Sequence, residues 1–419
     1  MNEPTPTPAP AARGYLQLLR ENRDFRLLYL GTLISLGGDW FLTVALLDLV
    51  LDLSRSATLV SVMLVCQTLP IFAATPFASS LVDKVDRRRI MVTANFISAG
   101  AALLPLLSTR SELLVFAYLG VIVIAVCSAY FEPSSQAALP NLVSAVDLPR
   151  AGVLMGSTWG TMLAVGAAVG GLVTVTLGRR VSFVVDSLSF LLSAALLLRV
   201  HGKFAEPRDV SKEHPSLIRS LQETLAFARS HPRALGLLVS KTGYGMSAGI
   251  LTMLSVFGKE VFRAGAFGIG ALYAARGIGA LIGPFVIRAV ARNDDQRYRM
   301  ISLCGIIFGC GYLGLAHSQS LLVGAMAIGI AHLGGGASWM TSTYGLQREV
   351  PDSIRGRVFS ADYGLFTLTM SVSCVVAGLL ADRFGPVAAT SGLAALSIAW
   401  AVVWGLATWK LWVKGEGSV

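Results

Sequence analysis

Three charged residues lie inside long apolar segments of the sequence, where charge is costly. Asp39, Lys241 and Arg276 are each flanked on both sides by stretches without another Asp, Glu, Lys or Arg. An ionisable side chain in such a place usually faces a polar cavity or a charged partner. A carboxyl group there can take up and release a proton, and nearby cations can adjust its proton affinity or meet an anionic group. We therefore predict Asp39 as a proton- or cation-coupling site; the alternatives are a structural Asp39–Arg276 ion pair and a hydrogen bond within its own helix.

A second group of charges lies in the short turn at 76–91, between two apolar runs. A carboxylate at the end of one helix can pair with Arg or Lys at the next and with the N-terminus of a neighbouring helix, which holds one conformation in place. The alternative is a plain basic loop, which needs the Arg residues but not Asp83. The predicted gating group consists of Asp83, Lys84, Arg87, Arg88, Arg150 and Arg357.

No pattern in the sequence is typical of an enzyme. There is no Gly-rich phosphate loop, no cluster with metal-ligand spacing, and no nucleophile with a nearby base. The composition, 54% hydrophobic and 14% charged, excludes an ordinary soluble domain, because such domains have about 25% charged residues. The net charge of +10 does not indicate nucleic acid, since the Lys and Arg residues lie in short loops without interleaved aromatic residues. We expect no catalysis, no cofactor, no bound metal and no nucleic-acid partner.

The charged residues are separated by apolar runs of membrane-spanning length. A helix needs about 20 residues to cross a hydrocarbon core of about 30 Å. These runs predict an all-α polytopic membrane protein with twelve transmembrane helices, at 28–50, 58–82, 90–108, 112–134, 153–177, 181–200, 235–257, 266–288, 300–316, 320–345, 358–381 and 386–412. Most of the 34 Lys and Arg residues fall in the two terminal segments and in every second loop. Because such residues accumulate on the cytoplasmic side, both termini are predicted to be cytoplasmic, in a multi-pass protein of the cytoplasmic (inner) membrane.

A polar segment divides the chain near its middle. Leu217, Leu221 and Leu225 recur in it at helical spacing, which is typical of an amphipathic helix on a membrane surface. The predicted regions are a disordered, basic cytoplasmic N-terminus at 1–27, six helices at 28–200, a cytoplasmic linker at 201–234, six helices at 235–413 and a cytoplasmic tail at 414–419.

The two sets of six helices carry signs of a duplication. Gly171 and Gly178 in the first set recur at the same separation as Gly378 and Gly385 in the second. This repeat predicts two pseudo-symmetric six-helix bundles. Small residues also fill the runs at 153–177 and 266–288, which lets these helices approach each other closely.

The turn at 76–91 resembles the signature Gly-x-x-x-Asp-Arg/Lys-x-Gly-Arg-Lys/Arg of the major facilitator superfamily. In register with it are Asp83, Lys84, Arg87 and Arg88, whereas Ser79 and Asp86 replace its two glycines. The Asp-Arg-Arg-Arg ending and the Leu-Pro-Asn-Leu-Val segment at 139–143 are similar to the branch of macrolide-efflux and enterobactin-exporter-type permeases, a branch of the drug:proton antiporters. Where that branch usually has Arg-Ala-Asn, this chain has Arg-Ala-Gly at 150–152.

The resemblance implies two halves that rock around a central site. In this superfamily helices 1, 4, 7 and 10 line the cavity and helix 8 borders it. Trp40, Tyr244 and Trp339 would then stack with a flat or cationic drug, or serve as interfacial anchors and packing residues. His332 would titrate near neutral pH, or be a satisfied packing residue. The predicted coupling and substrate cavity consists of Asp39, Lys241, Arg276, Trp40, Tyr244, Trp339 and His332.

Other charged residues near helix ends receive structural or gating roles. Asp186 is expected to pair with Arg179 or Arg180 near the outer end of the sixth helix. Glu132 and Asp362 are expected at inner helix ends, in gating or interface pairing rather than in contact with substrate.

These features predict a transporter of the multidrug-resistance type. Since the sequence holds no ATP-binding motif, its energy must come from an ion gradient. We expect a monomeric secondary active exporter of amphiphilic, drug-like small molecules, working by alternating access as a proton antiporter. The alternatives are a dedicated exporter or flippase for a siderophore or lysophospholipid, a metal-ion exporter, and a membrane-embedded enzyme or sensor.

Overall fold

The computed structural model describes residues 14–82, 85–202, 204 and 217–412, and all regular structure within them is helical. The gating residues Asp83 and Lys84 and the tail at 414–419 lie outside the described residues. Two helices reach into the segment predicted to be disordered, because α1 spans Tyr15–Glu21 and α2 already begins at Arg23.

The helices of the first half of the chain follow the predicted apolar runs. After α1 come α2 (Arg23–Ser54), α3 (Ala57–Val82), α4 (Arg87–Ala101), α5 (Leu114–Leu142), α6 (Leu148–Thr176) and α7 (Arg179–Leu198). Short 3-10 turns, Leu104–Leu107 and Ser111–Leu113, connect α4 to α5. The side chain of Asn22 accepts a hydrogen bond from the backbone N–H of Phe25 at 2.9 Å and thereby caps the N-terminus of α2.

The second half begins with α8, in the predicted linker. Its helices are α8 (Leu217–Ser230), α9 (Pro232–Ser247), α10 (Ile250–Val256), α11 (Gly265–Val290), α12 (Asp294–Ala316), α13 (Leu321–Glu349), α14 (Asp352–Phe384) and α15 (Pro386–Thr408). A π-helical turn, η3 (Phe257–Val261), follows α10, and a 3-10 turn, Trp409–Leu411, follows α15. Among the described residues, eleven helical segments are long and apolar enough to cross a membrane.

The predicted run at 235–257 is not one continuous helix, because α9 ends at Ser247 and α10 begins at Ile250. The hydroxyl of Ser373 on α14 stabilises the break: it donates to the carbonyl of Met246 at 2.6 Å and accepts from the N–H of Gly249 at 2.9 Å. These bonds satisfy backbone groups that a helix end leaves unpaired.

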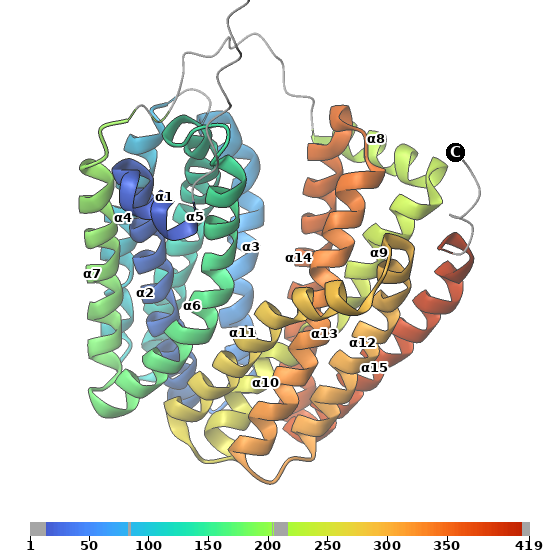
Figure 1. Cartoon of the computed structure of the whole chain (residues 1–419). Coiled ribbons are helices and arrows are strands. Elements are labelled where there is room, and N and C mark those ends of the chain that lie inside the picture. The colour runs from blue at the N-terminus through green and yellow to red at the C-terminus, as the bar shows by residue number, and fades with distance from the viewer. Residues whose placement is uncertain (1–13, 83–84, 203, 205–216, 413–419) are drawn as a thin grey trace, which may run out of the picture.

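The helices form two groups that meet at one end of the molecule (Figure 1). Helices α1–α7 lie on the left of that view and most of the later helices on the right, and the groups diverge towards the top. We call the end that carries α8 and the start of α2 the linker end. The opposite end, which carries the turns at Ser54–Ala57, Gly178 and Gly385, is the distal end.

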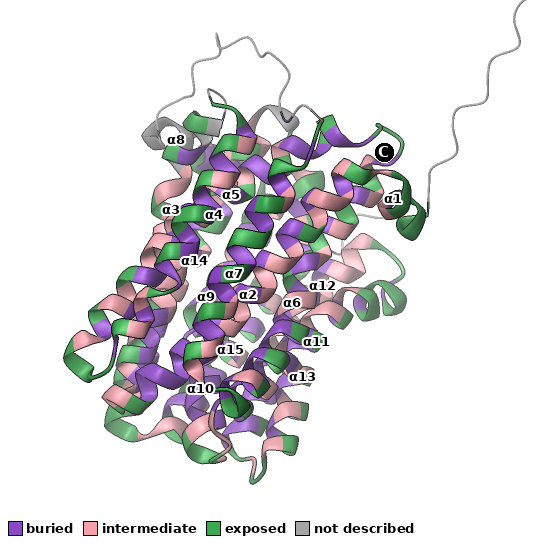
Figure 2. Ribbon diagram, turned by 90° about the vertical axis from the view of Figure 1, so that its left-hand side faces the viewer, coloured by how far each residue is buried: buried purple, intermediate pink, exposed green. Residues whose placement is uncertain are grey.

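The two groups pack through small residues. A Cβ atom on Gly270 of α11 would lie 2.5 Å from the carbonyl oxygen of Ala167 on α6. A Cβ atom on Gly378 of α14 would lie 2.5 Å from the Cα atom of Thr58 on α3. Glycine at these points lets the backbones touch. Around α10, near the distal end, buried residues from both groups form one continuous core (Figure 2).

Two of the repeated glycines have the same backbone conformation. Gly178, between α6 and α7, has φ 89° and ψ 158°, and Gly385, between α14 and α15, has φ 85° and ψ 158°. Residues with a side chain rarely adopt such positive φ values. The glycines that recur in the sequence therefore make equivalent distal turns.

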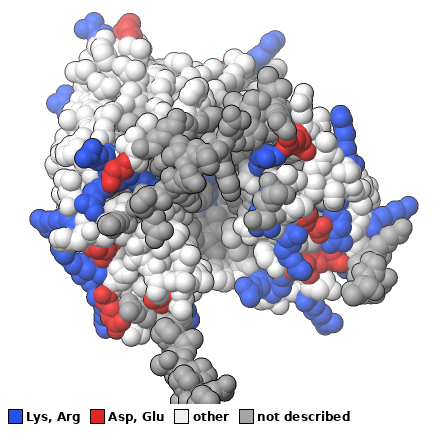
Figure 3. Space-filling view, turned by 90° about the horizontal axis from the view of Figure 1, so that it is seen from above, with Lys and Arg blue, Asp and Glu red and all other residues white. Residues whose placement is uncertain are grey.

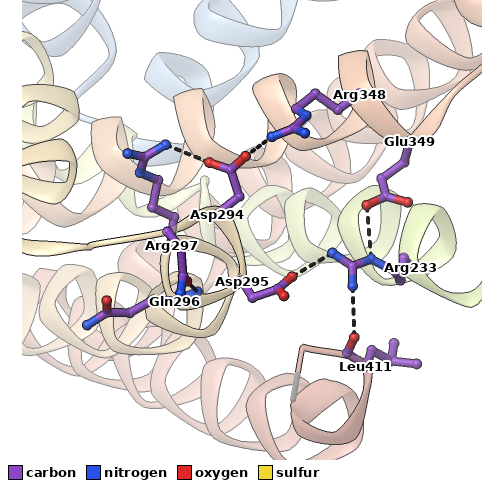
Figure 4. A network of polar contacts seen from close by, with 9 residues as sticks. Arg233, Asp294, Asp295, Gln296, Arg297, Arg348, Glu349 and Leu411 are labelled. Atoms are coloured by element: carbon purple, nitrogen blue, oxygen red, sulfur yellow. Dashed lines mark hydrogen bonds and ion pairs between the residues drawn. The ribbon is translucent and has the colours of Figure 1, made fainter. Parts of the chain in front are cut away.

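A network of ion pairs holds the linker end of the second group together (Figure 4). Arg233 on α9 contacts Asp295 on α12 at 2.6 Å and Glu349 on α13 at 2.9 Å. Asp294 on α12 pairs with Arg297 and Arg348. These contacts join three helices at the linker end, where a single partly exposed pair contributes little but a network can fix the helix ends.

Candidate functional site

The first part of the candidate site surrounds Asp39, at the middle of α2. Its Oδ1 atom is buried without a hydrogen-bond partner, and in the described part of the chain Asp39 forms no ion pair. Asp39 and Glu132 line the same cavity of about 30 Å³ between α2, α4, α5 and α7. A polar cavity of this size can hold a water molecule. Glu132 is exposed, so the cavity beside Asp39 is also lined by a residue at the surface of the molecule.

Asp186 on α7 is the third carboxyl group of this region. It is fully buried, and its Oδ2 atom has no hydrogen-bond partner. It lies against Gly38, where a Cβ atom would come within 2.5 Å of its Oδ1 atom, and it is close enough for its charge to interact with that of Asp39. The expected pairing with Arg179 or Arg180 is wrong, because Arg179 binds Asp48 and Asp52 instead.

The second part of the site lies between α9, α13 and α14. Lys241 forms an ion pair with Asp362, and both residues are buried, with side chains 5% and 4% exposed. The ammonium group also donates to the hydroxyl of Thr343 at 3.0 Å and lies 4.7 Å from the centre of the Trp339 ring. Asp362 was expected at an inner helix end. This expectation is wrong, because Asp362 lies in the interior of the second group.

Arg276 lies at the middle of α11, between aromatic rings. Its guanidinium carbon is 5.7 Å from the ring centres of Trp159 on α6 and Tyr273 on α11. Trp40 packs against the same Tyr273, with 5.7 Å between ring centres. Among the described residues, Arg276 has no carboxylate within ion-pair distance, so no Asp39–Arg276 pair is present.

Aromatic residues continue from Lys241 towards the distal end. Tyr244 packs against Phe308 at 4.6 Å and against Phe366 at 6.3 Å between ring centres. His332 is buried, and its Nε2 atom shares a hydrogen bond of 2.9 Å with the hydroxyl of Tyr312. This placement is that of a core histidine whose ring has a hydrogen-bond partner, and the role of His332 in transport stays a prediction.

The described members of the gating group lie at the linker end. Arg87 is buried and donates to the carbonyls of Ala137 and Phe204, and Arg88 donates to the carbonyl of Gly202 at 3.0 Å. Arg357 forms an ion pair with Glu223 on α8, and Arg150 is half-buried at the start of α6. Arg87 and Arg88 tie the linker segment to the first group of helices, and Arg357 ties it to the second.

The distal end is closed by contacts between the two groups that sequence reasoning did not find. The carboxylate of Asp382, at the end of α14, accepts from the hydroxyl of Ser56 and the N–H of Ala57, both at 2.7 Å, and from the N–H of Thr58 at 3.1 Å. It thus caps the N-terminus of α3, where the helix dipole favours a negative charge.

A second distal contact joins η3 to the end of α2. The ammonium group of Lys259 lies 2.6 Å from Oδ1 of Asp48 and also binds Asp52. Arg179 on α7 binds the same two carboxylates. Burial lowers the pKa of Lys259, and the hydrogen bond from Lys259 to Asp48 opposes that shift. The side chains of Lys259 and Asp48 are 15% and 8% exposed, so water screens this pair less than an ordinary surface ion pair.

The linker end, in contrast, is open. Seen from that side, the molecule is hollowed between the two groups, and Lys and Arg side chains, with Asp and Glu among them, lie on the groups to either side (Figure 3). The groups diverge towards this end (Figure 1), and the described cross-group contacts are concentrated at the distal end.

Helices of membrane-spanning length in two groups that diverge around a hollow, with ionisable residues buried inside each group, are typical of a multi-pass membrane transporter of the major facilitator type. The family model described as "Transmembrane secretion effector" matches residues 17–413. The chain therefore belongs to this family.

Relatives with assigned roles are transporters. The chain is 25% identical to the staphyloferrin A transporter of Staphylococcus aureus, over 94% of this chain and 96% of the relative. It is 24% identical to macrolide efflux protein A of Streptococcus pyogenes (86% and 90% covered) and 27% identical to the multidrug efflux pump Tap of Mycolicibacterium fortuitum (86% and 89%).

Solved structures support the fold. A bacterial homologue of the human lysosomal transporter Spinster, in an inward-facing and unoccupied conformation, matches with a TM-score of 0.70 at 14% identity. The match covers 95% of this chain and 99% of that one. At this identity the likeness concerns the fold alone.

Proposed function

We propose that this protein is a secondary active transporter that exports amphiphilic small molecules across the cytoplasmic membrane, with protons as the coupling ion. The observation that carries the proposal is the half-buried Asp39, whose Oδ1 atom is buried without a hydrogen-bond partner and which shares a cavity with Glu132. A transporter that exchanges protons for substrate needs an acid that is sheltered from bulk water yet connected to one side of the membrane.

Asp39 and the two carboxyl groups near it favour proton exchange. Glu132 is exposed, Asp39 is half-buried and Asp186 is fully buried, so they form a series of increasing depth. Carboxylates that lie close together without a cation cannot all be ionised, and they titrate as a coupled group. In the proposed mechanism Glu132 receives the proton and Asp39 holds it.

The membrane topology belongs to the same proposal. Together α9 and α10 supply a twelfth span across their break, giving two halves at 28–200 and 235–413 joined by the linker at 201–234. The predominance of Lys and Arg at the linker end supports a cytoplasmic position for that end and for both termini. The structure then corresponds to a state open to the cytoplasm and closed outside.

Alternating access requires the distal contacts to break and the linker end to close. The cap of Asp382 on α3 and the ion pairs of Lys259 with Asp48 and Asp52 stabilise the closed distal end. The contact of α6 with α11 runs through small residues, which allows the two halves to tilt without separating. We propose a monomer, since one chain supplies all of these parts.

The proposed substrate classes are those named for the related transporters. Macrolide efflux protein A and the pump Tap favour export of drug-like compounds. The staphyloferrin A transporter, which matches over 94% of this chain, favours the second candidate, a dedicated siderophore exporter. The unpaired Arg276 would suit the carboxylates of such a substrate.

Proton release on substrate binding tests the proposal. The purified protein in weakly buffered detergent should release protons when a macrolide or an aromatic dye binds, as measured with a pH-sensitive dye. Asp39→Asn and Glu132→Gln should reduce this release, and Glu112→Gln, which changes an exposed residue at the distal end, should not. Equal proton release from the native protein and from Asp39→Asn would contradict the coupling role.

A further inference from the structure

In the ion pair between Lys241 and Asp362, only the carboxylate lacks a hydrogen-bond partner. The ammonium group of Lys241 has three partners: Asp362, the hydroxyl of Thr343 and the face of Trp339. The Oδ1 atom of Asp362, in contrast, is buried and has no hydrogen-bond partner. What is missing around this pair is therefore a donor, not an acceptor.

The surroundings of the pair suit a cation. Trp339 and Phe366 meet edge to face at 4.8 Å, and Tyr244 stacks on Phe366 at 6.3 Å between ring centres. A carboxylate beside several aromatic faces is the usual recognition chemistry of organic ammonium groups. The ammonium group of Lys241 occupies that position now, on a long and flexible side chain.

One side of α14 borders the other group of helices, since a Cβ atom on Gly364 would lie 2.5 Å from the ring of Phe72 on α3. Asp362, two residues earlier, lies on a different side of the helix, where it meets Lys241 of α9. Trp339, Thr343 and Phe366 are only partly buried. A ligand between the two groups can therefore reach the aromatic rings first and the carboxylate behind them.

We propose that Asp362 binds the ammonium group of cationic substrates and that Lys241 is an internal occupant of the same site, displaced when substrate binds. Trp339 and Phe366 hold the apolar body of the ligand beside its charge. The inference rests on the proposed transport function, since it assigns the substrate class and the recognition residue of the same pathway. No covalent step is involved.

The test is equilibrium binding to the purified protein, without any gradient. The probe is radiolabelled propranolol, a secondary alkylamine with a naphthyl ring that is charged at neutral pH, and its control is the neutral N-acetyl derivative. We expect native protein to bind the amine about tenfold more tightly than the neutral compound. Because the assay needs no proton coupling, its result does not depend on the coupling role of Asp39.

Three variants separate the possible partners. Asp362→Asn should lower amine affinity about tenfold, and Lys241→Met should keep or raise it, because the competing ammonium group is gone. Removing one member of a buried pair can unfold the protein, so the double variant Lys241→Met with Asp362→Asn leaves no lone charge. It should remain folded by gel filtration and bind the amine and the neutral compound equally.

Two results would overturn the proposal. One is equal affinity of the native protein for the amine and its neutral derivative. The other is an unchanged preference for the amine in the double variant. A gain in affinity for an anionic probe in Asp362→Asn, together with no change for the amine, would instead identify Lys241 as the contact for an anionic group.

Discussion

At the residue scale, the ionisable residues of the two parts of the site are balanced differently. Asp39, Glu132 and Asp186 have no cation among the described residues, whereas Lys241 and Asp362 neutralise each other. An unneutralised buried carboxyl group has a strong tendency to hold a proton, and an ion pair does not. The two sets therefore suit different tasks, proton exchange in the first group and ligand recognition in the second.

Asp39→Asn should separate proton-driven transport from substrate movement. The amide has the shape of the protonated acid but cannot release a proton. We expect uphill accumulation of substrate in proteoliposomes to fall to the level of empty liposomes, while exchange of labelled for unlabelled substrate continues. Glu112→Gln is the control and should leave both rates unchanged. Loss of both activities in a folded Asp39→Asn variant would point to a structural role for this residue.

Individual residues could be selected from the sequence, but their partners could not. Asp39 and Lys241 stand out because each interrupts a long apolar run. Their neighbours, Glu132, Asp186 and Asp362, also lie within helices. Their contacts depend on the rotational orientation of three or more helices about their axes. Apolar runs of nearly uniform hydrophobicity do not specify that orientation. The apolar runs placed Glu132 and Asp362 near helix ends, and only the longer helices α5 and α14 of the structure place them well inside a helix.

At the element scale, the cap of Asp382 on α3 is expected to bias the protein towards the state closed at the distal end. Asp382→Asn removes the charge that the N-terminus of α3 favours. We expect a membrane-impermeant maleimide to label Ser61→Cys, in a chain without its own cysteines, about tenfold faster in this variant. Ser61 is buried beside Thr252 of α10.

An unchanged labelling rate in Asp382→Asn would show that the cap does not hold the distal end closed. The same Ser61→Cys chain with Glu112→Gln supplies the baseline, since Glu112 lies at the distal end but contacts only its neighbour Ser111 among the described residues.

The contact of α6 with α11 should tolerate no added side chain. In Gly270→Ala the new Cβ atom would meet the carbonyl of Ala167 at 2.5 Å, which should lower the free energy of unfolding by about 1–3 kcal/mol. Gly392→Ala on α15 is the matched control, because nothing lies within 4 Å of its Cβ position. Thermal unfolding in detergent measures both, and equal melting temperatures would contradict the close packing.

At the scale of the whole molecule, most helices and the repeat could be predicted from the sequence. Apolar length alone located eleven of the spanning segments. The break between α9 and α10 could not be predicted, because the hydroxyl of Ser373 on another helix stabilises it. The matching glycine turns at Gly178 and Gly385 were visible as a repeat, but the distal cap of Asp382 depends on how the two groups meet.

The most direct test of proton-driven export is transport into inside-out membrane vesicles with an imposed pH gradient. The panel contains aromatic dyes, macrolides and siderophores. We predict accumulation of several amphiphilic compounds that depends on the gradient, disappears with a protonophore and is absent in Asp39→Asn. Accumulation that is the same with and without the pH gradient would contradict a proton-coupled exporter. So would the absence of accumulation of every compound by folded protein.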